Sequence, residues 1–230
     1  TTTSGYNITS TLMESNSGTE LDPKIVFAET KHGVVFDGVW STLWVANDNT
    51  VWAGFRFTNN EQSAATSRTK LFHLDSSGSR ITCMKQEHAV TMTNGPHSVV
   101  GQNGRLNHGI EMDNCEVIGR GDNLTTVSPI VYALNQTDVS NSQYWRCHHN
   151  YFEGLMGVTN GPLGIMGIGW KEHTEPFTNV DNNFTKYIFE HNHYLRCGAG
   201  DEGWWTKSCG LIFRNNTIED GQKSTNVVPE

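Results

Sequence analysis

The chain has 230 residues, enough for one substantial core, and only 17% of them are charged, with a formal net charge of −8. This balance gives no general attraction for nucleic acid or for an acidic membrane surface, so an anionic ligand would need a local basic patch or a bound cation. No stretch reaches the roughly 20 apolar residues of a membrane span. The first residues, TTTSGYNITS, carry no signal-peptide pattern, which predicts a mature or trimmed chain.

Short strands are expected from the start of the chain. KIVFAET (24–30), GVVFDGVWSTLWVAN (33–47) and TVWAGFRF (50–57) alternate apolar and polar residues and are broken by Gly, Asn and Asp. The helical signal is weak throughout, because few windows place apolar residues at helical spacing and Gly interrupts most of them. The composition, rich in Gly, Asn, Thr and Ser, also favours an all-β protein with many turns.

Four later stretches resemble one another: each has an apolar strand, an Asn, a short apolar segment and a Gly. They are GIEMDNCEVIG (109–119), YWRCHHNYFEG (144–154), YIFEHNHYLRCG (187–198) and LIFRNNTIEDG (211–221), with Asn114, Asn150, Asn192 and Asn216 as the shared asparagines. An earlier copy, VWAGFRFTNN (51–60), has Gly54 in place of the Asn. The copies recur at irregular intervals of about 20 to 45 residues, which is typical of a solenoid with loops of varying length.

A parallel β-helix accounts for this pattern physically. Inward positions of each turn take Val, Ile, Phe or Leu, and corners take Gly or Asn, which tolerate left-handed backbone angles. Stacked Asn side chains can also hydrogen-bond along the ladder. A β-sandwich is the structural alternative, and NG or DG hairpin turns would support it. These dipeptides occur, at 94–95 and 37–38 for example, but they also suit β-helix corners.

The cysteines and glycosylation sequons leave several readings open. Five cysteines leave at least one thiol unpaired within the chain, and no CxxC motif occurs. Cys83, Cys115 and Cys147 are evenly spaced, so in a repeat protein they could stack on successive turns, or they could be buried free thiols. Sequons for N-glycosylation occur at Asn7, Asn123, Asn135, Asn183 and Asn215, a number that the composition also yields by chance.

The segments HNYFEG, GIMGIG and YIFEHNHYLRCGAGDEGWWTKSCGLIFRNNTIEDG resemble the central turns of polysaccharide lyase family 6, which contains chondroitinase B and alginate lyases. The N-terminal KIVFAETKHGVVFDG and VWAGFRFTNN resemble the opening turns of that family. The resemblance implies a single-domain right-handed parallel β-helix over residues 1–230. It also implies a secreted, extracellular enzyme that cleaves anionic, uronate-containing polysaccharide by calcium-assisted β-elimination.

The resemblance also assigns the reacting residues. Lys207, followed by Ser208, matches the lysine base of the family, and Glu202 matches the second acid of its metal-binding pair. The first acid of that pair is replaced by Gly200, and the adjacent Asp201 could contribute only through a bulge, since neighbouring strand residues point to opposite faces. Asn160 falls near the metal-binding Asn. These oxygen-bearing side chains suit calcium, which would neutralise the uronate carboxylate while Lys207 removes the adjacent proton.

Further residues are assigned by their place near that segment. Trp205 could stack on a sugar ring, and Lys171 and His173, in GWKEHTEPF (169–177), could line a substrate cleft. The catalytic arginine of the family is absent, because Val228, Pro229 and Glu230 stand where its Arg-His-Gly is expected. Lys223 is close enough in sequence to substitute for it. The family's β-helix continues for several more turns, so the resemblance implies a fragment or an early end, with an open face that favours end-to-end self-association.

Two other functional readings remain open. His191 and His193 are two residues apart and are expected to share a strand face, where His148 or His149 could join them to bind zinc or copper. The missing arginine and the Gly at the first acid also favour an inactive extracellular β-helix, serving as a carbohydrate-binding, adhesive or filament-forming module. A glycoside hydrolase would need two carboxylates across a cleft, which Asp201 and Glu202 alone do not provide.

Overall fold

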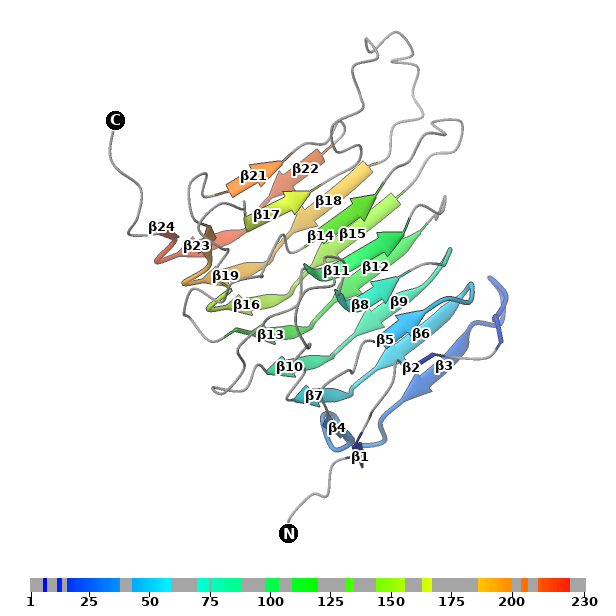
Figure 1. The fold of residues 1–230 in the computed structure, drawn as a ribbon. Helices are drawn as coiled ribbons and strands as arrows, with labels where there is room; N and C mark the ends of the chain where they lie inside the picture. Colours follow the sequence, from blue (N-terminus) through cyan, green and yellow to red (C-terminus); the bar gives the residue numbers. More distant parts are fainter. Residues whose placement is uncertain are drawn as a thin grey trace, which may run out of the picture.

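The chain folds as a parallel β-helix, as the sequence predicts, with three stacked sheets and successive turns in chain order (Figure 1). The computed structural model describes residues 6–7, 12–13, 16–37, 43–58, 70–74, 76–87, 98–103, 109–119, 131–134, 144–155, 163–166, 186–199, 204–206 and 211–223. Every strand pairing among these residues is parallel, so the β-sandwich alternative, which requires antiparallel hairpins, is wrong. Among the described residues, no helix has the length and apolar character needed to cross a membrane.

Three long sheets, named A, B and C, form the faces of the β-helix. Sheet A contains β1 (Tyr6–Asn7), β4 (Val35–Asp37), β7 (Arg56–Thr58), β10 (Lys85–Glu87), β13 (Glu116–Ile118), β16 (Tyr151–Glu153), β19 (His193–Leu195) and β23 (Thr217–Glu219). Sheet B contains β2 (Leu12–Met13), β5 (Leu43–Val45), β8 (Lys70–Leu74), β11 (Ser98–Asn103), β14 (Val131–Leu134), β17 (Leu163–Met166) and β21 (Trp204–Thr206). Sheet C contains β3 (Lys24–Phe27), β6 (Thr50–Ala53), β9 (Arg80–Thr82), β12 (Ile110–Asp113), β15 (Tyr144–His148), β18 (Lys186–Glu190) and β22 (Leu211–Arg214). A short fourth sheet pairs β20 (Gly198–Ala199) with β24 (Gln222–Lys223).

The core lies between the sheets and is built from apolar columns that run along the helix axis. In sheet C the residues Ile81, Met112, Cys147 and Phe189 are paired in register and fully buried. In sheet A the rings of Phe152 and Tyr194 stack at 5.1 Å between centroids. These columns follow from strand alternation, because every second residue of each strand points inward and meets its equivalent on the next turn.

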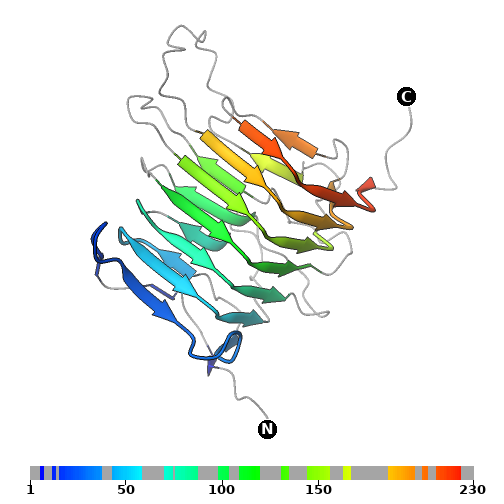
Figure 2. The same ribbon diagram turned by 180° about the vertical axis from the view of Figure 1, so that it is seen from behind.

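Figure 2 shows strands of sheet C leading into strands of sheet A. Residues 28–34 join β3 to β4, whereas on the six turns from β6 to β23 two residues make this connection. The first of the two always has a positive φ, as at Gly54 (79°), His149 (54°) and Asn215 (54°). This left-handed column comprises Gly54, Cys83, Asn114, His149, His191 and Asn215. Gly and Asn are favoured there because they adopt left-handed angles at the lowest cost.

The second corner residue forms the predicted asparagine ladder, with one correction. The Oδ1 atoms of Asn192 and Asn216 each accept a hydrogen bond from the backbone N–H of the equivalent Asn on the preceding turn, at 3.0 and 2.9 Å. The amide of Asn192 also donates to the carbonyl of Cys147 at 2.9 Å. Asn114, which was expected in this ladder, lies one residue earlier, in the left-handed column. Cys115 takes the ladder position and donates its N–H to Oδ1 of Asn150 at 2.9 Å.

The evenly spaced cysteines do not stack on one another. Cys83 lies at the corner, Cys115 in the ladder position and Cys147 in the inner column of sheet C, so each occupies a different column. These three and Cys197 are free thiols, whereas Cys209 lies outside the described residues. Burial raises the pKa of the Cys115 and Cys147 thiols and raises that of Cys197 to about 11. The described cysteines other than Cys83 are therefore packing residues of low reactivity.

Candidate functional site

The structure describes two of the predicted lyase residues, both through their backbones. Trp205 lies in β21, where it pairs with Gly164 of β17. Lys223 lies in β24, where it pairs with Ala199 of β20. The other predicted residues lie outside the described part of the chain: Asn160, Lys171, His173, Asp201, Glu202 and Lys207. Their predicted roles therefore stay predictions.

The strands around the predicted lyase segment nevertheless have a defined order. Residues 200–203 join β20 to β21, and residue 207 directly follows β21. β17 and β21 are neighbours in sheet B, with Leu163 paired to Trp204. The segment that resembles a metal-and-base strand is therefore attached to sheet B, and its N-terminal neighbour β20 pairs with the strand that carries Lys223.

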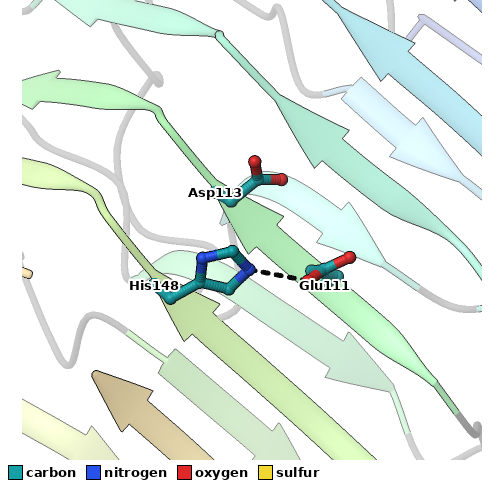
Figure 3. A group of neighbouring side chains, drawn as sticks. All are labelled: Glu111, Asp113 and His148. Carbon is teal, nitrogen blue, oxygen red and sulfur yellow. Dashed lines mark hydrogen bonds and ion pairs between the residues drawn. The ribbon is translucent and has the colours of Figure 1, made fainter. Parts of the chain in front are cut away.

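A different group of ionisable residues lies on the outer face of sheet C. Glu111 and Asp113 come from β12 and His148 from the neighbouring β15, and one potential ligand atom from each lies within 4.8 Å of the others (Figure 3). Glu111 Oε1 and His148 Nε2 are 2.6 Å apart. Two carboxylates and an imidazole are a donor set that could hold a metal ion of unknown identity.

Asp113 is already fully engaged with protein donors. Arg80 donates to both of its oxygens at 2.6 Å, and Thr82 and Asn114 donate as well, at 3.0 and 2.5 Å. Burial opposes the ionisation of Asp113, but the hydrogen bonds from Arg80 and its positive charge outweigh this effect and lower the pKa of the carboxyl group. A cation would have to displace Arg80 from Asp113. Calcium, which requires six or more oxygen ligands, therefore does not fit this group as it stands.

The rest of this face is a network of paired charges. Glu190 of β18 is buried and accepts from Arg146 at 2.6 Å on one side and from Arg214 at 2.7 Å on the other. The hydrogen bonds from Arg146 and Arg214 lower the pKa of Glu190 to about 2. Arginines and acids thus alternate from turn to turn. This arrangement avoids the repulsion that like charges on neighbouring strands would cause.

The histidine prediction is partly wrong. His191 and His193 do not share a strand face, because His191 is a left-handed corner residue with a φ of 56° and His193 belongs to β19. His193 instead contacts the ring of Tyr151 and lies 3.4 Å from Glu219. His191 stacks on His149 of the preceding turn, with ring centroids 4.9 Å apart, and the Nδ1 atoms of His148 and His149 are 2.8 Å apart.

Glu111 and Asp113 were not singled out in the sequence as site residues. Their signal was available: in IEMD the two acids alternate with apolar residues, and Asp113 has the same offset from the corner as His148. What the sequence did not show is the register, because the turns differ in length and no fixed period aligns residue 111 with residue 146.

Comparisons with known proteins define the class of fold. No family model matches the chain, and no curated protein matches it. Among solved structures, the chain is similar to the family 6 alginate lyase AlyGC and to a point mutant of that enzyme. The TM-scores are 0.63 and 0.66, with 20% and 19% sequence identity over 91% and 93% of this chain. This structural similarity agrees with the resemblance found in the sequence and establishes the shared β-helix fold. The chain spans only 28% of the length of each of these structures.

Proposed function

We propose that this chain is part of a polysaccharide lyase that cleaves an anionic, uronate-containing polysaccharide by calcium-assisted β-elimination. The main support is the backbone pairing of β17 with β21, on a fold similar to that of an alginate lyase. Leu163 and Trp204 are partners in sheet B. In sequence, Asn160 precedes Leu163 by the same number of residues as Asp201 precedes Trp204. The pairing supports a position for the proposed oxygen ligands on adjacent turns.

The same register supports a substrate-binding role for Trp205. Thr206, the next residue, belongs to a column that runs through Ile165, Val131 and Val100 to the buried Phe72. Consecutive strand residues alternate between the two faces, so this register supports a position for Trp205 on the outer face of sheet B. An aromatic residue on an outer face suits the apolar side of a pyranose ring.

Each residue then has a defined task. Asn160, Asp201 and Glu202 would hold calcium, which supplies charge neutralisation at the uronate carboxylate. Lys207 would remove the proton next to that carboxylate. Lys223 would take the place of the missing arginine, which is supported by its pairing with Ala199, two residues before Asp201. Lys171 and His173 would contact the substrate. Secretion into the extracellular space belongs to the same proposal.

The test is an elimination assay. Purified chain is incubated with alginate and with dermatan sulfate, with calcium or with a calcium chelator, and the ultraviolet absorbance of the new unsaturated uronate is followed. We expect product with calcium and a strong reduction with the chelator. An active family 6 lyase serves as the positive control, and the absence of product from every uronate polymer in its presence would exclude the enzymatic function.

A structural module is the second candidate function, and one observation favours it. Ile212, Phe213 and Ile218 are between 38% and 45% exposed on β22 and β23, which are the last strands of sheets C and A. In a solenoid such residues are covered by a further turn or by a second copy. Sedimentation over a range of concentrations tests this: growth of the assembly with concentration supports end-to-end self-association, and a constant monomer excludes it.

A further inference from the structure

The corner between sheets C and A holds the neighbouring histidines His148 and His149, and their chemistry does not depend on the proposed lyase activity. We propose that His148 and His149 form a binding site for a divalent transition-metal ion, with Cu²⁺ bound most tightly. The Nδ1 atoms of both residues would be the protein ligands, and water would complete the coordination.

The two Nδ1 atoms converge at a separation that suits one ion. They are 2.8 Å apart, and the two rings are nearly perpendicular, at 84°. Two nitrogens bound at about 2.0–2.1 Å would lie about 2.9 Å apart at a right angle and about 3.4 Å apart at a tetrahedral angle. The observed distance matches the right-angled arrangement, which Cu²⁺ and Ni²⁺ prefer over the tetrahedral geometry of Zn²⁺.

The other nitrogen of His148 is held in the way that metal-binding histidines usually are. Its Nε2 lies 2.6 Å from Oε1 of Glu111, so in the neutral imidazole the Nε2–H donates to the carboxylate and Nδ1 keeps its lone pair. The buried position of His148 fixes its ring in this orientation. Glu111 is thus a positioning residue, which orients the ring of His148.

His149 is oriented by a neighbour on the following turn. Its ring stacks on that of His191, with centroids 4.9 Å apart and an angle of 15° between the planes. Both residues occupy the left-handed column, one turn apart, which explains the separation. His149 and His191 are exposed, so an ion from solvent has access to Nδ1 of His149.

The fold does not require imidazoles at this corner. The same column holds Gly54, Asn114 and Asn215, and these residue types adopt a positive φ more easily than histidine does. His149 and His191 occupy this column on successive turns, and His149 is next to His148, which a carboxylate orients. A bound ligand explains this group of histidines better than the needs of the fold do. The nearby arginines do not prevent a cation from binding, because their charges are balanced: Arg80 is paired with Asp113, and Arg146 and Arg214 are paired with Glu190.

The experiment titrates Cu²⁺ into the purified chain at neutral pH, with calorimetry for affinity and electron paramagnetic resonance for the ligands. We expect one tight site with hyperfine coupling to two nitrogens. His149→Asn should weaken Cu²⁺ binding at least about 100-fold and remove the coupling to one nitrogen. Asn is suitable because this column already accommodates it at Asn114 and Asn215. Circular dichroism confirms that each variant is folded.

Three further variants separate a metal site from a simple hydrogen-bonded pair. Glu111→Gln should weaken binding about 10- to 100-fold and leave two nitrogen couplings. His191→Asn should cost less than about tenfold, because that residue only supports the ring of His149. His193→Asn, which changes a histidine of sheet A, should have no effect. Equal Cu²⁺ binding by the parent chain and His149→Asn, or no binding by the parent chain, would overturn the proposal and leave a His148–His149 hydrogen bond only.

Discussion

The two sides of this β-helix are built in different ways. Where sheet C meets sheet A, two residues make the connection on each of the six turns from β6 to β23, from Gly54 and Phe55 to Asn215 and Asn216. On the side of sheet B the connections differ widely: β5 ends at Val45 and β6 begins at Thr50, whereas β17 ends at Met166 and β18 begins at Lys186. The regular corner holds the turns in register, and the irregular side is where residues can be inserted without loss of that register.

This difference predicts that residues important for stability and residues important for activity lie on different sides of the β-helix. Loops held by a rigid scaffold are the usual place for binding and catalysis, whereas repeated buried contacts serve packing. In sequence, the proposed lyase residues other than Lys223 lie within or flank β17 and β21 of sheet B, and the asparagine ladder lies on the regular corner. Substitutions on the two sides should therefore affect different measurements.

The largest effect is expected for Lys207→Ala, on the sheet B side. If Lys207 is the base, lyase turnover should fall by about a thousandfold or more, with the free energy of unfolding unchanged. Turnover is measured by the uronate absorbance assay, and Lys85→Ala is the control. Lys85 is a half-buried lysine of sheet A that is paired with Glu87 and Glu116. Undiminished turnover in Lys207→Ala would remove this residue from the mechanism.

The next effect is expected for Asn192→Ala, on the regular corner. This change removes the acceptor of the Asn150 backbone N–H, one acceptor of the Asn150 side-chain amide, and the side-chain donor to the carbonyl of Cys147. Unpaired buried polar groups of this kind should lower the free energy of unfolding by about 3 kcal/mol. Denaturant unfolding measures it, and a loss below about 1 kcal/mol would show that the ladder contributes little.

Glu190→Gln should have a smaller effect that depends on pH. At pH 7 the loss of charge-assisted hydrogen bonds from Arg146 and Arg214 should cost about 1–2 kcal/mol. The pKa of Glu190 is lowered from 4.5 to about 2, so its ionised form stabilises the fold above pH 4.5 and this contribution is lost as the pH falls toward 2. Thermal unfolding of parent and variant should therefore converge over that interval. A constant difference would mean that the effect is not due to ionisation.

The smallest effect is expected for Asn215→Ala, one residue before the ladder. Asn215 is exposed with a φ of 54°, so the change should cost only about 1 kcal/mol, from the left-handed angle of a residue with a Cβ. Asn215→Gly should be neutral or slightly stabilising. Denaturant unfolding of both variants measures this pair. Equal losses in Asn215→Ala and Asn192→Ala would contradict the distinction between the left-handed column and the ladder.

The sequence by itself determined the architecture, since its signals are local: inward apolar residues alternate along each strand, and Asn or Gly stands where the backbone turns left-handed. It also located the asparagine ladder at Asn150, Asn192 and Asn216. Only the tertiary structure decided which residues meet across turns. It placed Cys115 rather than Asn114 in the ladder, separated the three evenly spaced cysteines, and brought Glu111 to His148. The physical reason is that the connections on the sheet B side vary in length, so contacts between turns depend on the pairing of strands and not on any fixed interval in the chain.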